Sequence, residues 1–354
     1  MTAARAAGAE RLDAFMARAN AAYYAGRDPF SDFITAPEIS QIFGEILGAW
    51  CVVAGTRLGG PAHLVEAGPG RGTLMADALR VITRAAPDFL QGGAVHLIET
   101  SPRLRACQAD ALRPFPVSPV WHETLETVPR GRMVLLANEF LDALPIRQFI
   151  RTSDGWGERY VEGGDWRVES LHDAPPELAV RDADLDDVVE ICPAALAFAE
   201  AVGERLVADP GVALFIDYGT ARSLPGDSLQ ALRDGRPASP LVDPGSADLT
   251  AHVDFEAFGA AAQLRGVRNF DVVEQGRLLA SLGAVERAAA LCKNAPEQAG
   301  AIRSGLDRLM APERMGRLFK AIALASPGQV APPGFEPDGA PFSVTGQRSS
   351  RNDD

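Results

Sequence analysis

The chain has 354 residues, of which 47% are hydrophobic, and it carries a formal net charge of −13 at pH 7. This composition supplies a sizeable core, and the acidic balance argues against a nucleic-acid partner, which requires a basic surface. No apolar run approaches the ~18–20 residues of a membrane span, so we expect no membrane insertion.

Two helices are predicted before the first strand. The first spans Ala9–Tyr24 and the second spans Gln41–Ala54. Thr35 is the predicted N-cap of the second helix, with Pro37 in the first turn and Glu38 at the capping-box position. A well-capped helix explains this pattern without any further role.

The stretch 63–74 reads HLVEAGPGRGTL and combines a short apolar run, a glycine cluster and the start of a helical pattern. The glycines stand at alternate positions: Gly68, Gly70 and Gly72. Thr73 then opens a helix whose apolar residues recur at helical spacing. The pattern predicts a strand, a tight turn and a helix N-terminus, where a ligand can approach a main chain that carries no Cβ.

The ligand of this turn is predicted from its spacing and from Glu66. The G-x-G-x-G spacing differs from the G-x-G-x-x-G of a dinucleotide site, where a helix N-terminus meets a pyrophosphate. Glu66 suits a cation better than a phosphate, and S-adenosyl-L-methionine (SAM) offers both an ammonium and a sulfonium. A plain strand-to-helix turn with no ligand is the alternative.

An acidic residue closes the next predicted strand, 94–98. At this place in nucleotide-binding α/β sheets an acid accepts hydrogen bonds from ribose hydroxyls, which predicts that role for Glu99, with Thr100 beside it. The gap from the glycines exceeds the usual ~20 residues, and a longer loop at 87–93 accounts for the excess. A solvated acid at a strand end is the alternative. Ser101 is the predicted N-cap of the following helix.

Polar residues also follow the strand predicted at 133–137, which comes after a short third strand at 121–123. They are Asn138, Glu139 and Asp142. Ligands bind outside the carboxyl ends of strands in open α/β sheets, so these side chains are expected in the same crevice as the glycine turn. There they would orient a nucleophile for in-line methyl transfer. Acids that only complement a helix dipole are the alternative.

The middle of the chain changes its pattern. Alternating apolar residues and glycine turns predict an antiparallel β-meander over 147–168. A helix is predicted over 186–207, and a fifth strand over 212–216 runs into Asp217 and Tyr218 at the crevice. Tyr218 either stacks on a ligand or only lines the pocket.

The segment 220–253 is irregular and is predicted as a long loop, which in a compact domain is usually functional or disordered. His252, near its end, is either a general base or an ordinary residue at the start of a helix over 255–264. A strand at 270–273, several helices and a last strand over 318–324 follow. Nothing in the chain has metal-ligand spacing.

The cysteines and the first residues predict the compartment. The four cysteines are far apart and form no C-x-x-C pair, as is typical of buried thiols in a reducing environment. The first residues lack the apolar segment of a signal peptide, and Glu10 and Asp13 disfavour a transit peptide. We therefore expect a cytoplasmic location in a bacterial cell.

These motifs together resemble the MidA family of SAM-dependent methyltransferases, which includes the mitochondrial complex I assembly methyltransferase. The matching segments follow family order between Tyr23 and Leu324: DPF…DFITAPEISQIFGE, EAGPGRGTLMADALR, IETSPRLRACQ, ANEFLDALPIRQF, FIDYG, GDSLQALR, ADLTAHVDF, EQGRLLASLG and MGRLFKAIA. In one departure Phe30 is followed directly by Ser31, where family members carry a few more residues near the expected substrate entrance.

The resemblance implies an α/β fold of the Rossmann-like, class I methyltransferase type, with a seven-stranded sheet, N-terminal helices and inserted helical and β-meander elements. We expect an N-terminal helical segment (1–60), a methyltransferase domain (61–326) with insertions at 146–210, 220–253 and 275–315, and a flexible tail (327–354).

The expected cofactor is SAM, with its ribose on Glu99 and its amino-acid end near Glu66. The residues predicted to bind it are Glu66, Gly68, Gly70, Gly72, Thr73, Glu99, Thr100 and Asn138.

In the mitochondrial branch the resemblance implies symmetric dimethylation of an arginine on a protein substrate, with a complex I subunit as the candidate. Glu139, helped by Asp142 or Asn138, is expected to orient the guanidinium by planar, charge-assisted hydrogen bonds, because a group with a pKa of roughly 12 or more is not easily deprotonated. His252 is the further catalytic candidate. A same-fold methyltransferase for small molecules and a non-catalytic SAM-binding assembly factor are the alternatives, and the sequence sets no oligomeric state.

Overall fold

A computed structural model describes residues 8–26, 34–60, 62–90 and 94–336. The shortened loop after Phe30 lies outside these residues, as does the predicted tail beyond residue 336. Within the described ranges, no helix is both long enough and apolar enough to span a bilayer.

A nine-stranded sheet forms the centre of the molecule, and seven of its strands lie side by side in the order β15-β17-β10-β5-β2-β3-β4. β2, β3, β4, β5 and β10 run parallel, and β17 is antiparallel to β10. The strands are β2 (His63–Ala67), β3 (Val95–Ile98), β4 (Val120–His122), β5 (Met133–Asn138), β10 (Gly211–Thr220), β14 (Val253–Asp254), β15 (Arg268–Asn269), β16 (Val273–Glu274) and β17 (Phe319–Ala325). The seven-stranded arrangement expected from the sequence is confirmed, with β14 and β16 as short additions.

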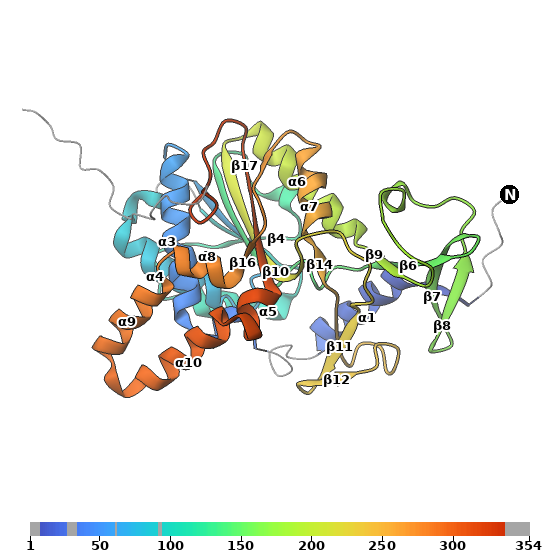
Figure 1. The fold of residues 1–354 in the computed structure, drawn as a ribbon. Coiled ribbons are helices and arrows are strands. Elements are labelled where there is room, and N and C mark those ends of the chain that lie inside the picture. The colour runs from blue at the N-terminus through green and yellow to red at the C-terminus, as the bar shows by residue number, and fades with distance from the viewer. Residues whose placement is uncertain (1–7, 27–33, 61, 91–93, 337–354) are drawn as a thin grey trace, which may run out of the picture.

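Helices cover both faces of this sheet, with α3 and α4 on one side and α6 and α7 on the other (Figure 1). Successive residues of β5 alternate between the two cores: Val134 and Leu136 belong to the first, Leu135 and Ala137 to the second. This alternation explains why the parallel strands are continuous apolar runs in the sequence. The main helices are α3 (Gln41–Arg57), α4 (Thr73–Ala85), α5 (Pro102–Leu112), α6 (Pro193–Ala208), α7 (Phe255–Gln263), α8 (Gln275–Ser281), α9 (Ala284–Asn294) and α10 (Ala299–Met310).

The predicted β-meander is present as a second, antiparallel sheet. It contains β1 (Glu10–Arg11), β6 (Arg147–Thr152), β7 (Gly155–Glu162), β8 (Asp165–Ser170) and β9 (Val188–Ile191). The predicted helix over 186–207 is wrong at its start, because residues 188–191 pair with β6 and α6 begins only at Pro193. The strand predicted at 270–273 is also misplaced, because residues 270–272 lie between two short strands, β15 and β16.

The prediction of a structureless loop over 220–253 is also wrong. This segment forms a third sheet of β11 (Gln230–Arg233), β12 (Arg236–Ala238) and β13 (Asp248–Thr250). Helix α1 (Leu12–Gly26) holds it, since Asn20 Nδ2 donates to Leu249 O at 2.8 Å and Asn20 Oδ1 accepts from Leu249 N at 3.1 Å. The Asn20 side-chain amide thus donates one hydrogen bond to Leu249 and accepts another from it, as the main chain of a neighbouring strand would.

The N-terminal capping prediction is corrected by the structure. A short helix, α2 (Ala36–Ile39), follows Thr35, and the cap of α3 is Ser40, whose hydroxyl accepts the Ile42 N–H at 3.3 Å. The α3 helix belongs to the main core and packs closely on α4. Helix α3 is therefore part of the main core of the fold.

The predicted flexible tail does not begin at residue 327. Trp50 Nε1 donates to Pro333 O at 3.0 Å, and the Phe335 ring is buried in the core beside α3. Residues 327–336 are thus a packed part of the fold.

Candidate functional site

The glycine turn has the backbone geometry that the sequence predicts. β2 ends at Ala67, and Gly68, Gly70 and Gly72 follow with φ angles of 67°, 53° and 84°. These left-handed values favour glycine. A Cβ on Gly68 would also lie 2.8 Å from the Phe140 ring, so this turn admits no larger residue without displacing its neighbour.

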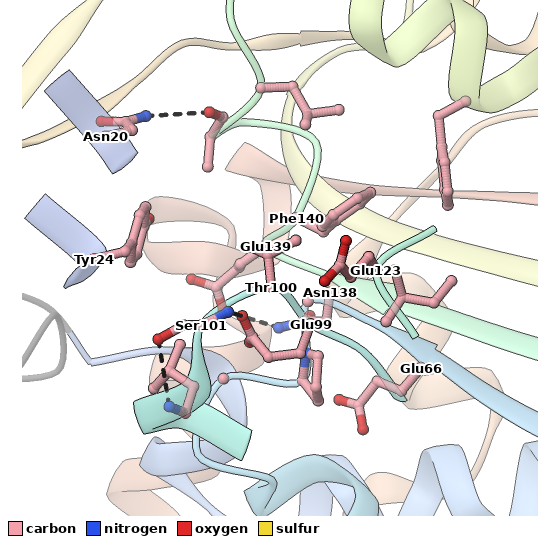
Figure 2. Close-up of a pocket in the computed structure, with 18 of the residues that line it drawn as sticks. Asn20, Tyr24, Glu66, Glu99, Thr100, Ser101, Glu123, Asn138, Glu139 and Phe140 are labelled. Atoms are coloured by element: carbon pink, nitrogen blue, oxygen red, sulfur yellow. Dashed lines mark hydrogen bonds between the residues drawn. The ribbon is translucent and has the colours of Figure 1, made fainter. Parts of the chain in front are cut away.

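A cavity of about 910 Å³ opens at the carboxyl ends of the parallel strands, beside this turn. Figure 2 shows Asn20 and Tyr24 of α1 on one side of the cavity, Glu66 on the other, and Glu139 and Phe140 between them. The structure brings together Glu66, Gly68, Gly70, Thr73, Glu99, Thr100, Asn138 and Glu139 as lining residues. Among the described residues, three that the sequence predicts for the site do not line it: Gly72, Asp142 and His252.

Glu66 is a buried acid at the bottom of the site. Its side chain is 2% exposed, and its Oε2 atom has no hydrogen-bond partner among the described residues. Burial raises the pKa of Glu66 to about 8. A cationic ligand group beside this carboxyl would supply the missing partner and favour its ionised form.

Glu99 is held by a clamp that the sequence does not reveal. Its Oε1 atom accepts the Ser101 N–H at 2.8 Å, and its Oε2 accepts from Gln108 Nε2 at 3.2 Å. Gln108 is fully buried, and the same nitrogen also donates to Gly70 O at 2.7 Å. One glutamine of α5 therefore fixes the glycine turn relative to the acid of β3. Burial raises the pKa of Glu99.

Glu139 lies at the junction between β5 and the turn that follows. Its Oε1 atom accepts two hydrogen bonds, from Ala36 N at 2.8 Å and from Asn138 Nδ2 at 3.0 Å. Burial raises the pKa of Glu139 to about 7, with the Asp142 charge acting in the same direction. Asn138 is 8% exposed, and its Oδ1 atom is without a hydrogen-bond partner within the described part of the chain. Both side chains are thus fixed on one side and open to a ligand on the other.

Asp142 supports this turn from behind the cavity wall. It is buried, its pKa is raised to about 6 by burial, and the nearby Tyr218 hydroxyl opposes part of that rise. The Tyr218 ring packs between His252 and Phe319 at centroid distances of 5.6 and 5.5 Å. Tyr218 therefore has neither of the two roles considered for it at the crevice.

His252 lies apart from the large cavity. It contributes to the wall of a separate space of about 30 Å³, and burial together with the Lys320 charge lowers its pKa. This position corrects its prediction as a general base, and we give it no catalytic role.

Several site residues escaped the sequence analysis. Glu38 was interpreted as a capping residue, yet it lines the cavity and accepts from the Thr73 hydroxyl at 2.6 Å. Glu123 was interpreted only as the end of a strand, and it too lines the cavity. Gln108 carries a usable signal, since it lies between Leu104 and Leu112 on the buried stripe of its helix.

The charges around the cavity favour a cation. Of the described lining residues, six are acidic and one is basic: Glu38, Glu66, Glu99, Glu123, Glu126 and Glu139 against Arg71. Such an imbalance favours positively charged ligand groups.

Comparison with known proteins decides the family. The model of a family described as "Putative S-adenosyl-L-methionine-dependent methyltransferase" matches residues 46–273. The chain belongs to this family. This match confirms the prediction made from the resemblance to the MidA family: the protein is a SAM-dependent methyltransferase.

Relatives of the methyltransferase cover most of its length. The Protein arginine methyltransferase NDUFAF7 homolog, mitochondrial, of Drosophila melanogaster is 36% identical over 91% of this chain and 82% of that protein. Protein arginine methyltransferase NDUFAF7, mitochondrial, of Homo sapiens is 34% identical over 85% and 76%, respectively. A Burkholderia thailandensis protein crystallised with S-adenosyl-homocysteine aligns with a TM-score of 0.79 and 28% identity, covering 93% of this chain and 90% of that chain.

The cofactor of the methyltransferase is SAM, and the donor set fits it. The unpartnered Glu66 oxygen suits a cationic group, and the glycine turn gives open main chain beside it. The Glu99 carboxylate at the end of β3 suits vicinal hydroxyls.

Proposed function

We propose that this enzyme methylates arginine side chains of a protein substrate, forming symmetric dimethylarginine. The curated relatives in fly and human carry the name protein arginine methyltransferase, which supports this substrate class. The observation that carries the proposal is the Glu139 carboxylate, which lines an acidic cavity and whose two hydrogen bonds to the described residues are both on Oε1.

In the proposed mechanism Glu139 and Asn138 orient the guanidinium. Glu139 Oε2 and Asn138 Oδ1 accept hydrogen bonds from its nitrogens, and this planar arrangement localises the positive charge on one side of the group. The opposite nitrogen then becomes the better nucleophile. When bound, SAM supplies an electrophilic methyl group on its positively charged sulfur.

The reaction also releases a proton, because the guanidinium gains a methyl group and has to lose one hydrogen to keep a single positive charge. Glu139, with a pKa of about 7, is suited to accept that proton from the nitrogen that its Oε2 atom holds, as the opposite nitrogen is methylated. Phe140 and Phe198, whose rings pack 5.1 Å apart, line the same cavity and exclude water from the reacting groups.

For the cofactor we propose contacts from Glu66, the glycine turn with Thr73, Glu99 with Thr100, and Asn138. Gly72 contributes through its left-handed backbone at the start of α4, and Asp142 contributes by supporting Glu139. We further propose that the enzyme works in the cytoplasm on a protein partner, with a subunit of respiratory complex I as the first candidate.

The test is an analysis of the methylated product. The enzyme is incubated with methyl-labelled SAM and two peptide libraries, one with a fixed central arginine and one with a fixed central lysine. We expect label only in the arginine library, and symmetric dimethylarginine after acid hydrolysis. Label on another residue, or in neither library, would contradict the proposal.

A further inference from the structure

An open groove continues from the cavity along helix α1. The cavity shares Ala17, Pro145 and Ala194 with a neighbouring hollow of about 380 Å³. That hollow in turn shares Arg11 and Ala14 with a third space of about 530 Å³. Because neighbouring spaces share lining residues, we treat the three as one passage, which we call the α1–α6 groove.

Two helix faces made of alanine form the walls of this groove. Those on α1 are Ala14, Ala17, Ala21 and Ala25, and those on α6 are Ala194, Ala197 and Ala201. All four alanines on α1 are exposed. A helix face that remains in contact with water usually carries charged residues. Here every position along the stripe is a methyl group, which leaves room for a polypeptide main chain.

The length of the groove suits a peptide better than a free amino acid. From Ala14 to Ala25 the helix rises about 17 Å. This distance equals about five residues of extended chain. A single arginine bound in the cavity would leave the two outer spaces, both bordered by Arg11 and Ala14, empty.

The charges of the groove change along its length. At the outer end Arg11 and Asp13 neutralise each other, with Nε–Oδ1 and Nη2–Oδ2 distances of 2.6 Å. At the inner end lie the acidic cavity and Asn138, a buried side chain whose Oδ1 has no partner among the described residues. The groove therefore fits a ligand with a neutral, extended body and a cationic side chain.

We propose that the α1–α6 groove binds an extended segment of the protein substrate, with its main chain between the two alanine faces and its arginine side chain directed to Glu139. This inference rests on the proposed function. It assigns substrate selection to α1 and α6, outside the cofactor site, and it limits the residues next to the target arginine to small side chains on the groove side.

The first test blocks the outer groove without touching the cavity. Ala14→Trp places an indole at an exposed position that borders only the two outer spaces, and Ala289→Trp on α9 is the matched control at an exposed helical alanine. The probes are a peptide library with a fixed central arginine and the small compound N-acetylarginine methylamide.

We expect Ala14→Trp to lower kcat/KM for the library by about tenfold, mainly through KM, and to leave SAM affinity and the rate with the small compound unchanged. The Ala289 variant should behave as wild type with both probes. Equal activity of wild type and Ala14→Trp on the library would overturn the inference while leaving arginine methylation intact.

A second measurement does not depend on methyl transfer. A photoreactive benzophenone amino acid replaces Ala14 or Ala289 in the full chain, which is irradiated with a biotinylated library in the presence of S-adenosylhomocysteine. Cross-linking at position 14 but not at 289 supports the groove. Cross-linking without methylation would retain the groove and reject the proposed function, and no cross-linking at position 14 would reject the groove.

Discussion

Asp217 holds the main chain at Leu141 through a hydrogen bond of 2.9 Å from the Leu141 N–H to its Oδ2 atom. The same oxygen accepts the N–H groups of Phe140 at 3.1 Å and Asp142 at 3.2 Å. Glu139, immediately before this turn, has a φ of 50°, a left-handed value that is uncommon for a residue with a Cβ. Asp217, near the end of strand β10, thus fixes the conformation that directs Glu139 into the cavity.

Replacing Asp217 by asparagine should therefore loosen the Glu139 turn. The new amide would face the Tyr218 N–H that Asp217 Oδ1 now accepts at 2.9 Å, so a donor would meet a donor. We expect a loss of about 1–3 kcal/mol in the free energy of unfolding, measured in urea. Asp173→Asn at an exposed position is the control and should unfold as wild type does. If Asp217→Asn unfolded with the same free energy as wild type, the turn would keep its conformation without the Asp217 carboxylate.

Gln108 offers a test of the cofactor site at a position behind it. Gln108→Leu removes the clamp between Gly70 O and Glu99, so the glycine turn and the carboxylate lose their fixed separation. We expect SAM affinity to fall by about tenfold, equivalent to about 1.4 kcal/mol, in a calorimetric titration. Glu99→Gln should not add its full effect to that of Gln108→Leu, because both changes act on one network. Additive losses would mean that Gln108 and Glu99 act on SAM binding independently and not through one network.

The burial of Glu66 lets us predict how the free energy of unfolding depends on pH. Its pKa rises from 4.5 to about 8 on folding, so the folded chain binds this proton more tightly than the unfolded chain does. The resulting stabilisation is present below the unfolded value and is lost as the pH rises through the folded one. The side chain of the Glu66→Gln variant stays neutral at every pH. Measured without SAM, the unfolding free energy of the variant minus that of wild type should therefore increase between about pH 5 and pH 8.

Urea unfolding across this range checks the prediction for Glu66. Glu297→Gln, at an exposed position, serves as the control and should follow wild type at every pH. A difference between Glu66→Gln and wild type that does not vary with pH would show that Glu66 has an ordinary pKa.

The pH dependence of catalysis should follow Glu139. Its carboxyl must be ionised to accept the guanidinium hydrogens, and burial raises its pKa to about 7. We therefore expect kcat/KM for an arginine peptide to rise about tenfold per pH unit below that value and to level off above it. A rate that stays flat from pH 5.5 to pH 8, roughly the range in which this carboxyl ionises, would exclude it as the titrating group.

The sequence predicts the parts of the fold that are set locally. The apolar runs of β5 and β10 and the glycine turn before α4 each carry their signal within a few residues. The strand β9 does not, because four residues of mixed pattern before Pro193 can continue a helix as easily as pair with β6. Its strand conformation comes from the partner strand.

The site was predicted in part for the same reason. Glu66 is the second-last residue of β2, and Glu99 and Glu139 directly follow β3 and β5, so their positions at the sheet edge follow from the strand assignments. The contacts that hold them join distant segments: Gln108 reaches Gly70 across 38 positions of the chain. No local pattern specifies such a contact. His252 shows the converse error, because it is a polar residue before a predicted helix that packs on Tyr218 and lies apart from the cavity.

The most direct measurement compares wild type with Glu139→Gln, following both SAM binding by calorimetry and methyl transfer to the arginine peptide library. We expect both proteins to bind SAM within about threefold of each other. Transfer should fall by about a hundredfold or more in the variant, because the neutral amide no longer localises the guanidinium charge. Full transfer by Glu139→Gln with SAM still bound would contradict the account.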